Sequence, residues 1–565
     1  MTHTPPTTDA SPEPGRSRPR ASLALWLQAA AALMWLPQAA ALALGVGRIA
    51  EGGGATAMLA PAAALIGFGA LRAGLDAAGQ RLAFRDARAE LSRLRFNATR
   101  ALAARSPLDA GRAPSGLAAS VLAEQAEAVT AYVARFQPAR FKATAVPLVI
   151  LACVAPLSWL AALILMAAAP LIPLFMALVG WRAKAASERQ FVAMGEMNGF
   201  LLDRLRGLDA IRSAGAVEAT AQRVRAEADG LRRRAMAVLR IAFLSSAVLE
   251  LFSALGVALV AVYVGFNLLG QIPFGAWGGR LSLPEGLFVL LLAPAFFEPL
   301  RELSAAWHDR ASGQAALEAL ERLAAPGRMA LPGAVDEPAF APPFGPAPVV
   351  RLKGLRFAHD GAERPALDGF SLVVAPGERV AVLGPSGTGK STLLALIAGL
   401  APAAGGRILI GGAEMTPDTA AALRARMVWI GQTPHVFSGS LSRNVRLGRP
   451  DIGRVQAERA LRATALGPLL DRRGDAAVGE NGLGLSGGET LRLALARLAV
   501  APGATLVLAD EPTAHLDRET ARQIMDALIA LSAGRTLIVA THDPELAARM
   551  DRIVRFDDAR LEDAA

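Results

Sequence analysis

The stretch GPSGTGKS, from Gly384 to Ser391, fits the pattern G-x-x-x-x-G-K-[ST]. A loop of this kind binds phosphate through backbone N–H groups, because unpaired donors and aligned peptide dipoles meet negative charge at the start of the following helix. Its Lys reaches the β and γ phosphates of a nucleotide, and its last hydroxyl is offered to Mg²⁺. The stretch predicts an ATP site that includes Gly384, Gly387, Thr388, Gly389, Lys390, Ser391 and the adjacent Thr392.

A pair of carboxylates follows this loop. The sequence TLVLADEP, from Thr505 to Pro512, reads as a buried strand that ends in Asp510 and Glu511. Isolated Asp-Glu pairs are usually solvated surface acids, but this pair closes a run of four apolar residues and lies 120 positions beyond Lys390. We therefore expect Asp510 to hold Mg²⁺ together with Ser391, and Glu511 to orient or deprotonate the attacking water. Few other side chains are needed, because phosphoryl transfer depends mostly on positioning and charge stabilisation.

Two further motifs accompany the phosphate loop and the carboxylate pair. The pentapeptide LSGGE at Leu485 to Glu489 lies between the loop and the carboxylate pair, and His542 follows the apolar stretch RTLIVAT. The four elements together resemble the ATP-binding-cassette (ABC) ATPases, in which the signature of a second nucleotide-binding domain completes each ATP site. The resemblance implies that His542 contacts the γ-phosphate. It also assigns contact with a partner's nucleotide to Ser486, Gly487 and Gly488, although the signature ends in Glu489 where the family usually has Gln.

The same resemblance assigns roles to single residues elsewhere. Gln432, in VWIGQTPHVF, resembles the glutamine that senses Mg²⁺ and the γ-phosphate, which makes it a candidate metal ligand. Asp517, in AHLD, resembles the aspartate that couples the two ATP sites. His359 stands where the family usually has an aromatic residue on adenine, so we expect a weaker stacking contact from its imidazole. Glu480 lies where exporters carry a glutamate that contacts the membrane domain, and a solvated surface acid is the alternative interpretation.

The N-terminal half is too apolar for an ordinary soluble protein, and it makes the 565-residue chain 53% hydrophobic and only 19% charged. Four runs with at most one charge reach the roughly 20 residues that span a bilayer core, namely 21–47, 52–71, 143–181 and 241–266. The third run has twice the necessary length and reads as two spans that turn near Pro156 to Trp159. A sixth, weaker span centres on Leu287 to Phe297. We therefore predict six spans in a lipid bilayer.

Basic residues follow the membrane topology. Twelve Lys and Arg residues lie between Arg72 and Lys142 and 12 between Arg182 and Arg240, whereas the other connections between spans hold almost none. Because such residues accumulate on the cytoplasmic side of membranes, we expect the N-terminus, both long connections and the C-terminal half in the cytoplasm. The net charge of +10 therefore does not indicate nucleic-acid binding, and no RNA- or DNA-binding motif accompanies it.

Composition divides the chain into four parts. Pro, Thr, Ser and Arg dominate the first part, which reads as a disordered tail. Seven prolines between Pro326 and Pro348 mark the third part as a linker. Alternating strand-like and helix-like segments after it predict an α/β P-loop ATPase domain. The expected parts are a tail at 1–20, an α-helical transmembrane domain at 21–323, a linker at 324–348 and an ATP-binding domain at 349–565.

Two long basic connections of the transmembrane domain show helical periodicity. Apolar residues recur at three and four spacing through Arg81 to Leu102 and Phe191 to Met236, with Arg and Glu between them. We therefore expect the spans to continue as helices well beyond the membrane.

A chain with six spans and one ATPase domain resembles the half-transporters among ABC exporters, which work as dimers. The membrane stretches AAPLIPLFMALVG (168–180), GFLLDRLRGLDAIRSAGA (199–216), VLRIAFLSSAVLELFSALGVALVAVYVGFNLLG (238–270) and LAPAFFEPLREL (292–303) are similar to the CydD subunits of the CydDC family of heterodimeric thiol exporters in bacterial inner membranes. The resemblance implies a CydC-type partner and ATP-driven export of glutathione or L-cysteine to the periplasm, in support of cytochrome bd assembly. It also implies that Gly207 to Ala216 is a coupling helix against the partner's ATPase domain.

Several alternatives stay open at this point. Haem association is possible by the family resemblance only. Glu250 is the one charge within a long span, where a carboxylate costs about 2.5 to 3.5 kcal/mol. It therefore either lines a cargo pathway or pairs with an Arg that joins two helices. The competing functions are a homodimeric exporter of lipid or drug, and a haem-linked membrane assembly factor that moves no thiol.

Overall fold

The structure is a computed structural model, and its contacts divide the chain into two compact units. We call residues 1–96 and 115–322 the helical unit, and residues 97–114 and 323–565 the α/β unit. The structure describes residues 23–170, 193, 197, 200, 201, 203–205, 207–334, 347–475, 477–479, 482, 484–557 and 560–563. The predicted tail, residues 335–346 of the linker and Glu480 lie outside the described residues.

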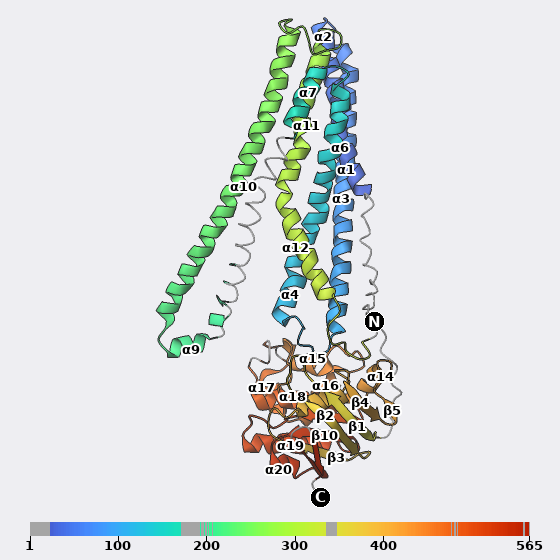
Figure 1. Ribbon diagram of the computed structural model, residues 1–565, viewed down its shortest axis with the longest axis vertical. Coiled ribbons are helices and arrows are strands. Elements are labelled where there is room, and N and C mark those ends of the chain that lie inside the picture. Colours follow the sequence, from blue (N-terminus) through green and yellow to red (C-terminus); the bar gives the residue numbers. More distant parts are fainter. Residues whose placement is uncertain are drawn as a thin grey trace, which may run out of the picture. The chain divides into compact units, whose positions relative to one another are not determined.

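Long helices make up the helical unit (Figure 1). They are α1 (Leu23–Leu33), α2 (Trp35–Ala50), α3 (Leu59–Ala103), α4 (Ser115–Ala123), α5 (Ala128–Ala131), α6 (Gln137–Val154), α7 (Trp159–Ala168), α9 (Leu208–Ser213), α10 (Val217–Leu268), α11 (Leu283–Ala305) and α12 (Trp307–Ala324). Short 3-10 or π turns lie at Ala55–Met58, Gln125–Glu127 and Tyr132–Phe136.

Four helical stretches of the described residues are long and apolar enough to cross a membrane: Leu23–Ala50, Thr56–Ala103, Ala247–Leu268 and Leu283–Ala305. They overlap the first, second, fifth and sixth predicted spans, and flanking residues complete the weak sixth span as expected. The predicted turn near Pro156 to Trp159 is also present, because α6 ends at Val154 and α7 begins at Trp159. Part of the fourth predicted span lies outside the described residues.

Helix α11 forms the centre of the packed helical unit. Its buried face includes Val289, Leu292 and Phe296, which are fully inaccessible to solvent and pack against α6 and α10. Close packing with α10 depends on Gly256, since an added Cβ would lie 2.5 Å from the Phe297 ring. A capping box of Ser282 and Glu285 begins the helix. This face fixes α6, α10 and α11 as one bundle.

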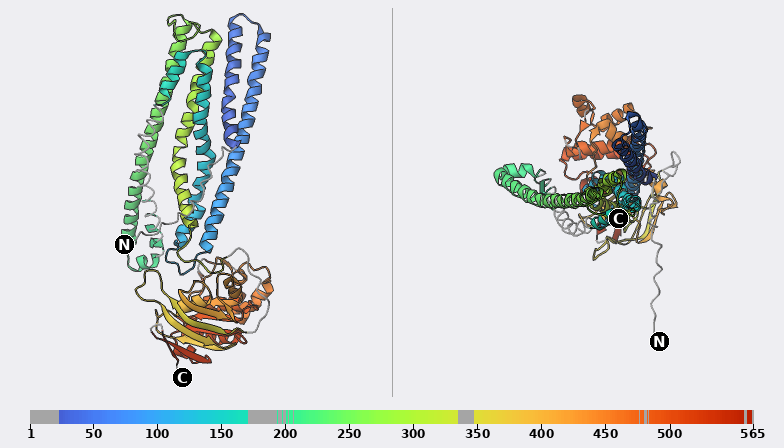
Figure 2. Two further views of the ribbon diagram at one scale, coloured as in Figure 1. Left: turned by 45° about the vertical axis from the view of Figure 1, so that its right-hand side comes forward. Right: turned by 90° about the horizontal axis from the view of Figure 1, so that it is seen from above.

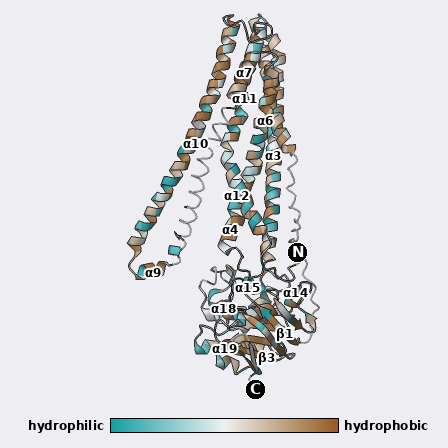
Figure 3. Cartoon of the chain, in the orientation of Figure 1, coloured by the Kyte–Doolittle hydropathy of each residue, from teal (hydrophilic) through white to brown (hydrophobic). Residues whose placement is uncertain are grey.

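The polarity of α10 changes along its length (Figure 3), with apolar residues towards its C-terminal end and more polar residues towards its N-terminal end. The expected continuation of spans beyond the membrane is therefore present. In the described part of Phe191 to Met236 the expected helical pattern forms two helices, because α9 ends at Ser213 and α10 begins at Val217. Gly215 lies between them with φ +64°, a left-handed conformation that ends a helix at little cost for glycine.

Strands and short helices make up the α/β unit (Figure 2). Its described residues form three sheets. A four-stranded antiparallel sheet has the order β2-β1-β4-β5, a six-stranded sheet has the order β12-β11-β3-β10-β9-β6, and β7 pairs with β8. The strands are β1 (Val350–Phe357), β2 (Leu367–Val374), β3 (Arg379–Leu383), β4 (Gly405–Ile410), β5 (Ala413–Glu414), β6 (Met427–Ile430), β7 (Gly439–Ser440), β8 (Ala477–Val478), β9 (Leu506–Asp510), β10 (Thr536–Thr541), β11 (Arg552–Asp557) and β12 (Arg560–Asp563).

Helices surround these sheets and confirm the predicted α/β class. They are α13 (Lys390–Ile397), α14 (Ala420–Arg424), α15 (Leu441–Arg446), α16 (Arg454–Ala463), α17 (Gly467–Arg473), α18 (Gly487–Ala499), α19 (Arg518–Leu531) and α20 (Pro544–Ala547). Helices α15 to α18 share a separate apolar core. The central sheet is buried on both faces, as is usual for parallel strands.

The α/β unit also includes a segment from the first long connection, residues 97–114. The Ser106 hydroxyl donates to the Leu400 carbonyl at 2.6 Å, and the Leu331 N–H donates to the Ala104 carbonyl at 2.8 Å. Leu108 packs on the apolar core beneath the four-stranded sheet. This segment was not among the residues that the sequence assigned to the ATP-binding domain.

Candidate nucleotide-binding site

The expected site residues meet at one edge of the six-stranded sheet. Strands β3, β10, β9 and β6 are parallel neighbours, so their carboxyl ends lie at the same edge. The phosphate loop follows β3, His542 follows β10, Asp510 ends β9 and Gln432 comes two residues after β6. The order of these strands therefore brings together residues that lie up to 158 positions apart in the chain.

The phosphate loop has a backbone that only glycine adopts easily. Gly387 has φ +85° and Gly389 has φ +105°. A Cβ on Gly389 would lie 2.7 Å from the Ala366 carbonyl oxygen, and one on Gly384 would lie 2.5 Å from the Phe556 carbonyl oxygen. Helix α13 begins at Lys390, directly after the loop. Its first N–H groups have no partner within the helix and can bind an anion.

Lys390 and Glu511 lie together at the base of this loop. The Lys390 Nζ donates to the carbonyls of Gly384 and Pro385 at 2.7 Å each, and lies 3.5 Å from Glu511 Oε1. Glu511 Oε2 lies 2.6 Å from His542 Nδ1 and accepts from the His542 N–H at 3.3 Å. Glu511 is buried and has φ +48°, a conformation uncommon outside glycine and frequent at functional sites. Its carboxylate is therefore held in one position by a cation, a ring and a backbone donor.

Asp510 is buried beside Ser391, away from solvent. Burial raises the pKa of Asp510, and a hydrogen bond with the Ser391 side chain and the charge of Lys390 oppose that rise. Its Oδ1 atom is buried and has no hydrogen-bond partner among the described residues. A buried carboxylate oxygen without a partner is costly unless something binds it. A free carboxylate oxygen next to a hydroxyl is the donor set that Mg²⁺ prefers, so these residues fit the ion.

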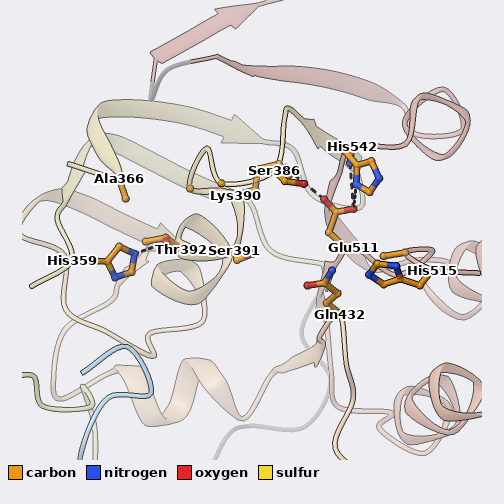
Figure 4. A pocket seen from close by; sticks show the side chains of 13 residues that line it. His359, Ala366, Ser386, Lys390, Ser391, Thr392, Gln432, Glu511, His515 and His542 are labelled. Carbon is orange, nitrogen blue, oxygen red and sulfur yellow. Dashed lines mark hydrogen bonds and ion pairs between the residues drawn. The ribbon is translucent and has the colours of Figure 1, made fainter. Parts of the chain in front are cut away.

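A cavity of about 640 Å³ opens above these groups (Figure 4). In Figure 4 Glu511 and His542 face one another, and Gln432 and His515 lie beside them. At the other side, His359 Nε2 lies 3.1 Å from Thr392 Oγ1 and its ring packs edge-to-face on Phe357. The lining residues are His359, Ala366, Ser386, Gly387, Gly389, Lys390, Ser391, Thr392, Gln432, Glu511, Ala514, His515 and His542.

Some expected residues lie outside this cavity. Asp517 is the N-cap of α19, where it accepts from the Thr520 N–H at 2.9 Å, and this bond lowers its pKa. Thr388 points back to the Pro385 carbonyl at 2.9 Å. Ser386, Ala366 and Ala514 line the cavity without having been predicted from the sequence. No pattern marks Ala366, whereas Ser386 is a variable position within the recognised loop and Ala514 precedes a recognised motif.

The signature residues Ser486, Gly487 and Gly488 also lie outside the cavity, at the N-terminus of α18. The Glu489 N–H donates to Ser486 Oγ at 3.2 Å, and the Ser486 N–H donates to Glu489 Oε2 at 2.7 Å. These two bonds form a capping box. Glu489 therefore begins the helix and also places a carboxylate next to Ser486.

The helical unit and the nucleotide cavity define an ABC transporter that joins a membrane domain and an ATPase domain in one chain. The model of the ABC transporter family matches residues 367–514, and that of the ABC transporter transmembrane region matches residues 109–287. The protein is thus a multi-pass membrane protein that couples ATP hydrolysis to transport.

Comparison with individual proteins refines this class. The chain is 36% identical to the transport ATP-binding protein AarD of Providencia stuartii over 88% of its length and 84% of the relative. It is also 36% identical to the glutathione/L-cysteine transport system ATP-binding/permease protein CydD of Escherichia coli, over 79% and 76%. A bacterial Atm1-family ABC exporter with ATP bound has a TM-score of 0.71 at 25% identity, covering 96% of this chain and 93% of that one. The chain belongs to the CydD family of ABC transporters.

Proposed function

We propose that this chain is one half of a heterodimer that uses ATP to export glutathione or L-cysteine from the cytoplasm to the periplasm, with a CydC-type subunit as its partner. The observation that carries the dimer is the position of the signature, since Ser486 to Gly488 lie outside the chain's own ATP cavity. The cargo is supported by the name of the CydD relative from Escherichia coli, which is 36% identical. Export of thiols in turn supports cytochrome bd assembly.

The residues around the phosphate loop have distinct roles in this proposal. Lys390 and the N–H groups after Gly387 bind the β and γ phosphates, with Gly384 and Gly389 letting the loop approach them. Glu511 orients or deprotonates the attacking water, since a fixed carboxylate near the phosphate suits general-base catalysis. His542 holds Glu511 at 2.6 Å and reaches the γ-phosphate from the same position.

Mg²⁺ would be held by Asp510 and Ser391, with Gln432 as a further ligand. When bound there, the ion neutralises phosphate charge and orients the γ-phosphate. Asp510 is suited to hold the ion because its buried Oδ1 atom accepts no hydrogen bond from the described residues. His359 contacts the adenine ring from the far side of the cavity. Its imidazole gives a weaker stacking surface than the usual aromatic residue.

The second ATP site is completed by this chain's signature. Ser486 and Gly488 face the partner's γ-phosphate, while the partner's signature covers Lys390 and Glu511. Asp517 couples the two sites through α19, which it caps. ATP then draws two domains together because it binds the closed state more tightly, and this difference in affinity drives the change in the spans. Helix α9, within the predicted coupling segment, contacts the partner's ATPase domain.

The proposed location is the bacterial inner membrane, with the N-terminus and the α/β unit in the cytoplasm. The support is the distribution of Lys and Arg, which places both long basic connections on one side.

Haem association rests on the family resemblance alone. His308 is the one histidine in the described part of the helical unit, and the other described histidines lie in the α/β unit. No step of the proposed transport needs haem.

Two other functions compete with thiol export. A homodimeric lipid or drug exporter is compatible with the intact Ser486 and Gly488. A haem-linked assembly factor is compatible with the membrane domain but gives the cavity no thiol-dependent role. A homodimeric exporter would be active without a CydC-type subunit. In a haem-linked assembly factor, haem and not thiols would stimulate ATP hydrolysis.

Uptake into inverted membrane vesicles tests cargo, direction and partner together. Vesicles carry this chain with and without a CydC-type subunit, and uptake of labelled glutathione and labelled cysteine is followed with and without ATP. We expect ATP-dependent uptake of at least one thiol only when both subunits are present. Uptake of neither thiol by the heterodimer contradicts thiol export, and full uptake by this chain alone contradicts the heterodimer.

A further inference from the structure

Five charged side chains lie together within the apolar helices of the helical unit. We call Lys142 of α6, Glu250 of α10, and Glu298, Arg301 and Glu302 of α11 the charged layer. Glu250 lies within the candidate span Ala247–Leu268, and the three α11 residues lie within Leu283–Ala305. Charges within spans are rare because they are costly there, so such a group requires an explanation.

Ion pairs join the three helices at this layer. Arg301 Nη1 donates to both carboxylate oxygens of Glu250, at 3.2 and 3.3 Å, and Arg301 Nη2 lies 3.1 Å from Glu298 Oε2. Lys142 pairs with Glu302. The Nε of Arg301 is buried and has no hydrogen-bond partner among the described residues. Glu250 therefore has the Arg partner that one of the two interpretations of the sequence required.

The pair also lies at one depth. Glu250 lies 18 residues before the end of α10 at Leu268, and Arg301 lies 18 residues after the start of α11 at Leu283. At about 1.5 Å per residue both are about 27 Å from the connection between these helices. A bilayer core is about 30 Å thick. The layer therefore lies near the opposite face of the membrane, where a solute entering from that side first meets the spans.

Exposure shows that the pairing does not cover these groups. The side chain of Glu250 is 62% exposed, that of Glu298 58% and that of Arg301 32%. Near the face of the membrane a charged side chain reaches water at little cost, so these exposed groups are open to a polar ligand. One turn further along α10 the hydroxyl of Ser253 is buried without a partner among the described residues. An ion pair that served only to join α10 and α11 would need one carboxylate, whereas Arg301 has two half-exposed ones beside it, Glu250 and Glu298.

The composition of the layer indicates the ligand. Three carboxylates accompany two cations, so the layer has one acceptor in excess that can take an ammonium group. The guanidinium of Arg301 has a flat fork of donors that binds a carboxylate through two bonds. An α-amino acid head carries both groups on one carbon. Cysteine has this head, and glutathione has it at its γ-glutamyl end.

We propose that the charged layer binds the α-ammonium and α-carboxylate groups of the thiol cargo, with Glu250 and Glu298 on the ammonium and Arg301 on the carboxylate. The proposal rests on thiol export as the proposed function. It explains how one site accepts both cysteine and glutathione, since the layer binds the α-ammonium and α-carboxylate groups that both molecules carry. The cargo replaces part of the contact between Glu250 and Arg301 when it binds.

Competition with thiols that lack one charged group tests this assignment. Heterodimer vesicles take up labelled cysteine in the presence of unlabelled cysteine, cysteamine, which lacks the carboxylate, or 3-mercaptopropionate, which lacks the ammonium. We expect unlabelled cysteine to compete about tenfold better than either analogue, the factor that corresponds to about 1.4 kcal/mol. In Arg301→Gln, unlabelled cysteine should no longer compete better than cysteamine but should still compete better than 3-mercaptopropionate. In Glu250→Gln, unlabelled cysteine should no longer compete better than 3-mercaptopropionate but should still compete better than cysteamine.

Two ratios, the potency of cysteine as a competitor relative to cysteamine and relative to 3-mercaptopropionate, distinguish cargo recognition from a structural role. A variant that only loosens the helix contact lowers uptake but leaves both ratios unchanged, and that result overturns the proposal. Arg232→Gln, at an exposed pair with Asp229 on α10, is the matched control and should change neither ratio. If Arg301→Gln does not assemble, the same ratio in Arg301→Lys should fall partly, because Lys keeps the charge and loses the fork. Absence of thiol uptake by the unaltered heterodimer would instead remove the proposed function.

Discussion

Glu511 in the nucleotide cavity and Glu250 in the charged layer are both carboxylates held by a cation, but they differ in burial. The side chains of Glu511 and Lys390 are 11% and 5% exposed, whereas those of Glu250 and Arg301 are 62% and 32% exposed. A buried carboxylate with several partners stays in one position, which suits a group that must orient water. A half-exposed pair is held weakly, because such pairs contribute about 0 to 1 kcal/mol, and a ligand can replace one partner. Burial therefore separates a group suited to chemistry from groups suited to recognition.

The largest expected effect comes from removing the buried charge. Glu511→Gln should keep ATP bound and slow hydrolysis in this chain's site by about 10²- to 10⁴-fold, the usual contribution of a general base. Phosphate release is measured in a heterodimer whose partner carries a substituted phosphate-loop Lys, so that only this site turns over. Glu545→Gln, at a surface pair 3.2 Å from Arg522, is the control and should be neutral. Undiminished hydrolysis would exclude Glu511 from the reaction.

A second variant tests whether the cavity depends on its backbone. Gly389→Ala places a Cβ 2.7 Å from the Ala366 carbonyl oxygen at a residue with φ +105°. Strain of this kind costs about 1 to 3 kcal/mol, so we expect ATP affinity to fall about tenfold or more. Gly503→Ala is a matched control, since an added Cβ there meets nothing within 4 Å. Equal ATP affinity in the two variants, measured by equilibrium binding to the heterodimer, would show that the loop tolerates a side chain.

The carboxylate of Glu489 in the signature is partly buried, and its charge has a predicted electrostatic effect on the partner's nucleotide. Glu489→Gln keeps the capping box, because Gln also accepts from the Ser486 N–H, but removes a negative charge beside the partner's γ-phosphate. Charges at a helix N-terminus contribute about 0.3 to 1 kcal/mol. We therefore expect the partner's site to bind ATP about two- to fivefold more tightly. The measurement is ATP binding to a heterodimer whose own Lys390 is replaced by Ala.

Glu489→Ala separates charge from capping in the same assay. It should tighten ATP binding less than Glu489→Gln and lower the melting temperature slightly, since it removes the Glu489 half of the capping box while Ser486 still caps the helix. If neither variant changes the partner's affinity, the carboxylate does not sense the nucleotide.

The smallest effect concerns a surface pair that responds to pH. Hydrogen bonding to Arg379 lowers the pKa of Asp551, whose side chain is 40% exposed. A lowered pKa in the folded state contributes stability above the unfolded pKa of about 3.9, and this contribution disappears as pH falls through the folded value. Asp551→Asn should therefore lower the melting temperature slightly and by a constant amount between pH 7 and pH 5. The difference should shrink below about pH 4, and a difference that grows there would contradict the sign.

The sequence predicted those site residues that contiguous motifs mark. Gly387, Lys390 and Glu511 could be found because phosphate binding and hydrolysis require certain residue types at fixed spacing around a turn or a strand end. His542 and Gln432 could be found because each follows an apolar strand, although only the order of β3, β10, β9 and β6 brings them together.

Contacts between distant residues could not be predicted. Glu250 and Arg301 are 51 positions apart, and no local pattern shows which Arg a carboxylate in a span will meet. The contact of Ser106 with Leu400 joins positions 294 apart within the α/β unit, and no local pattern in the membrane connection shows it. Helical periodicity alone does not show the break at Gly215, because the periodicity continues on both sides of it and one glycine is tolerated within a helix.

Thiol-dependent ATP hydrolysis tests the central claim most directly, because it requires the nucleotide cavity and the membrane helices to act together. The purified heterodimer is reconstituted in lipid, and phosphate release is measured with increasing glutathione, cysteine or haem. Coupled thiol export predicts that glutathione or cysteine raises the rate several-fold and that Glu511→Gln in this chain abolishes the stimulated turnover of its site. A rate that haem or lipid raises while both thiols leave it unchanged would contradict thiol export.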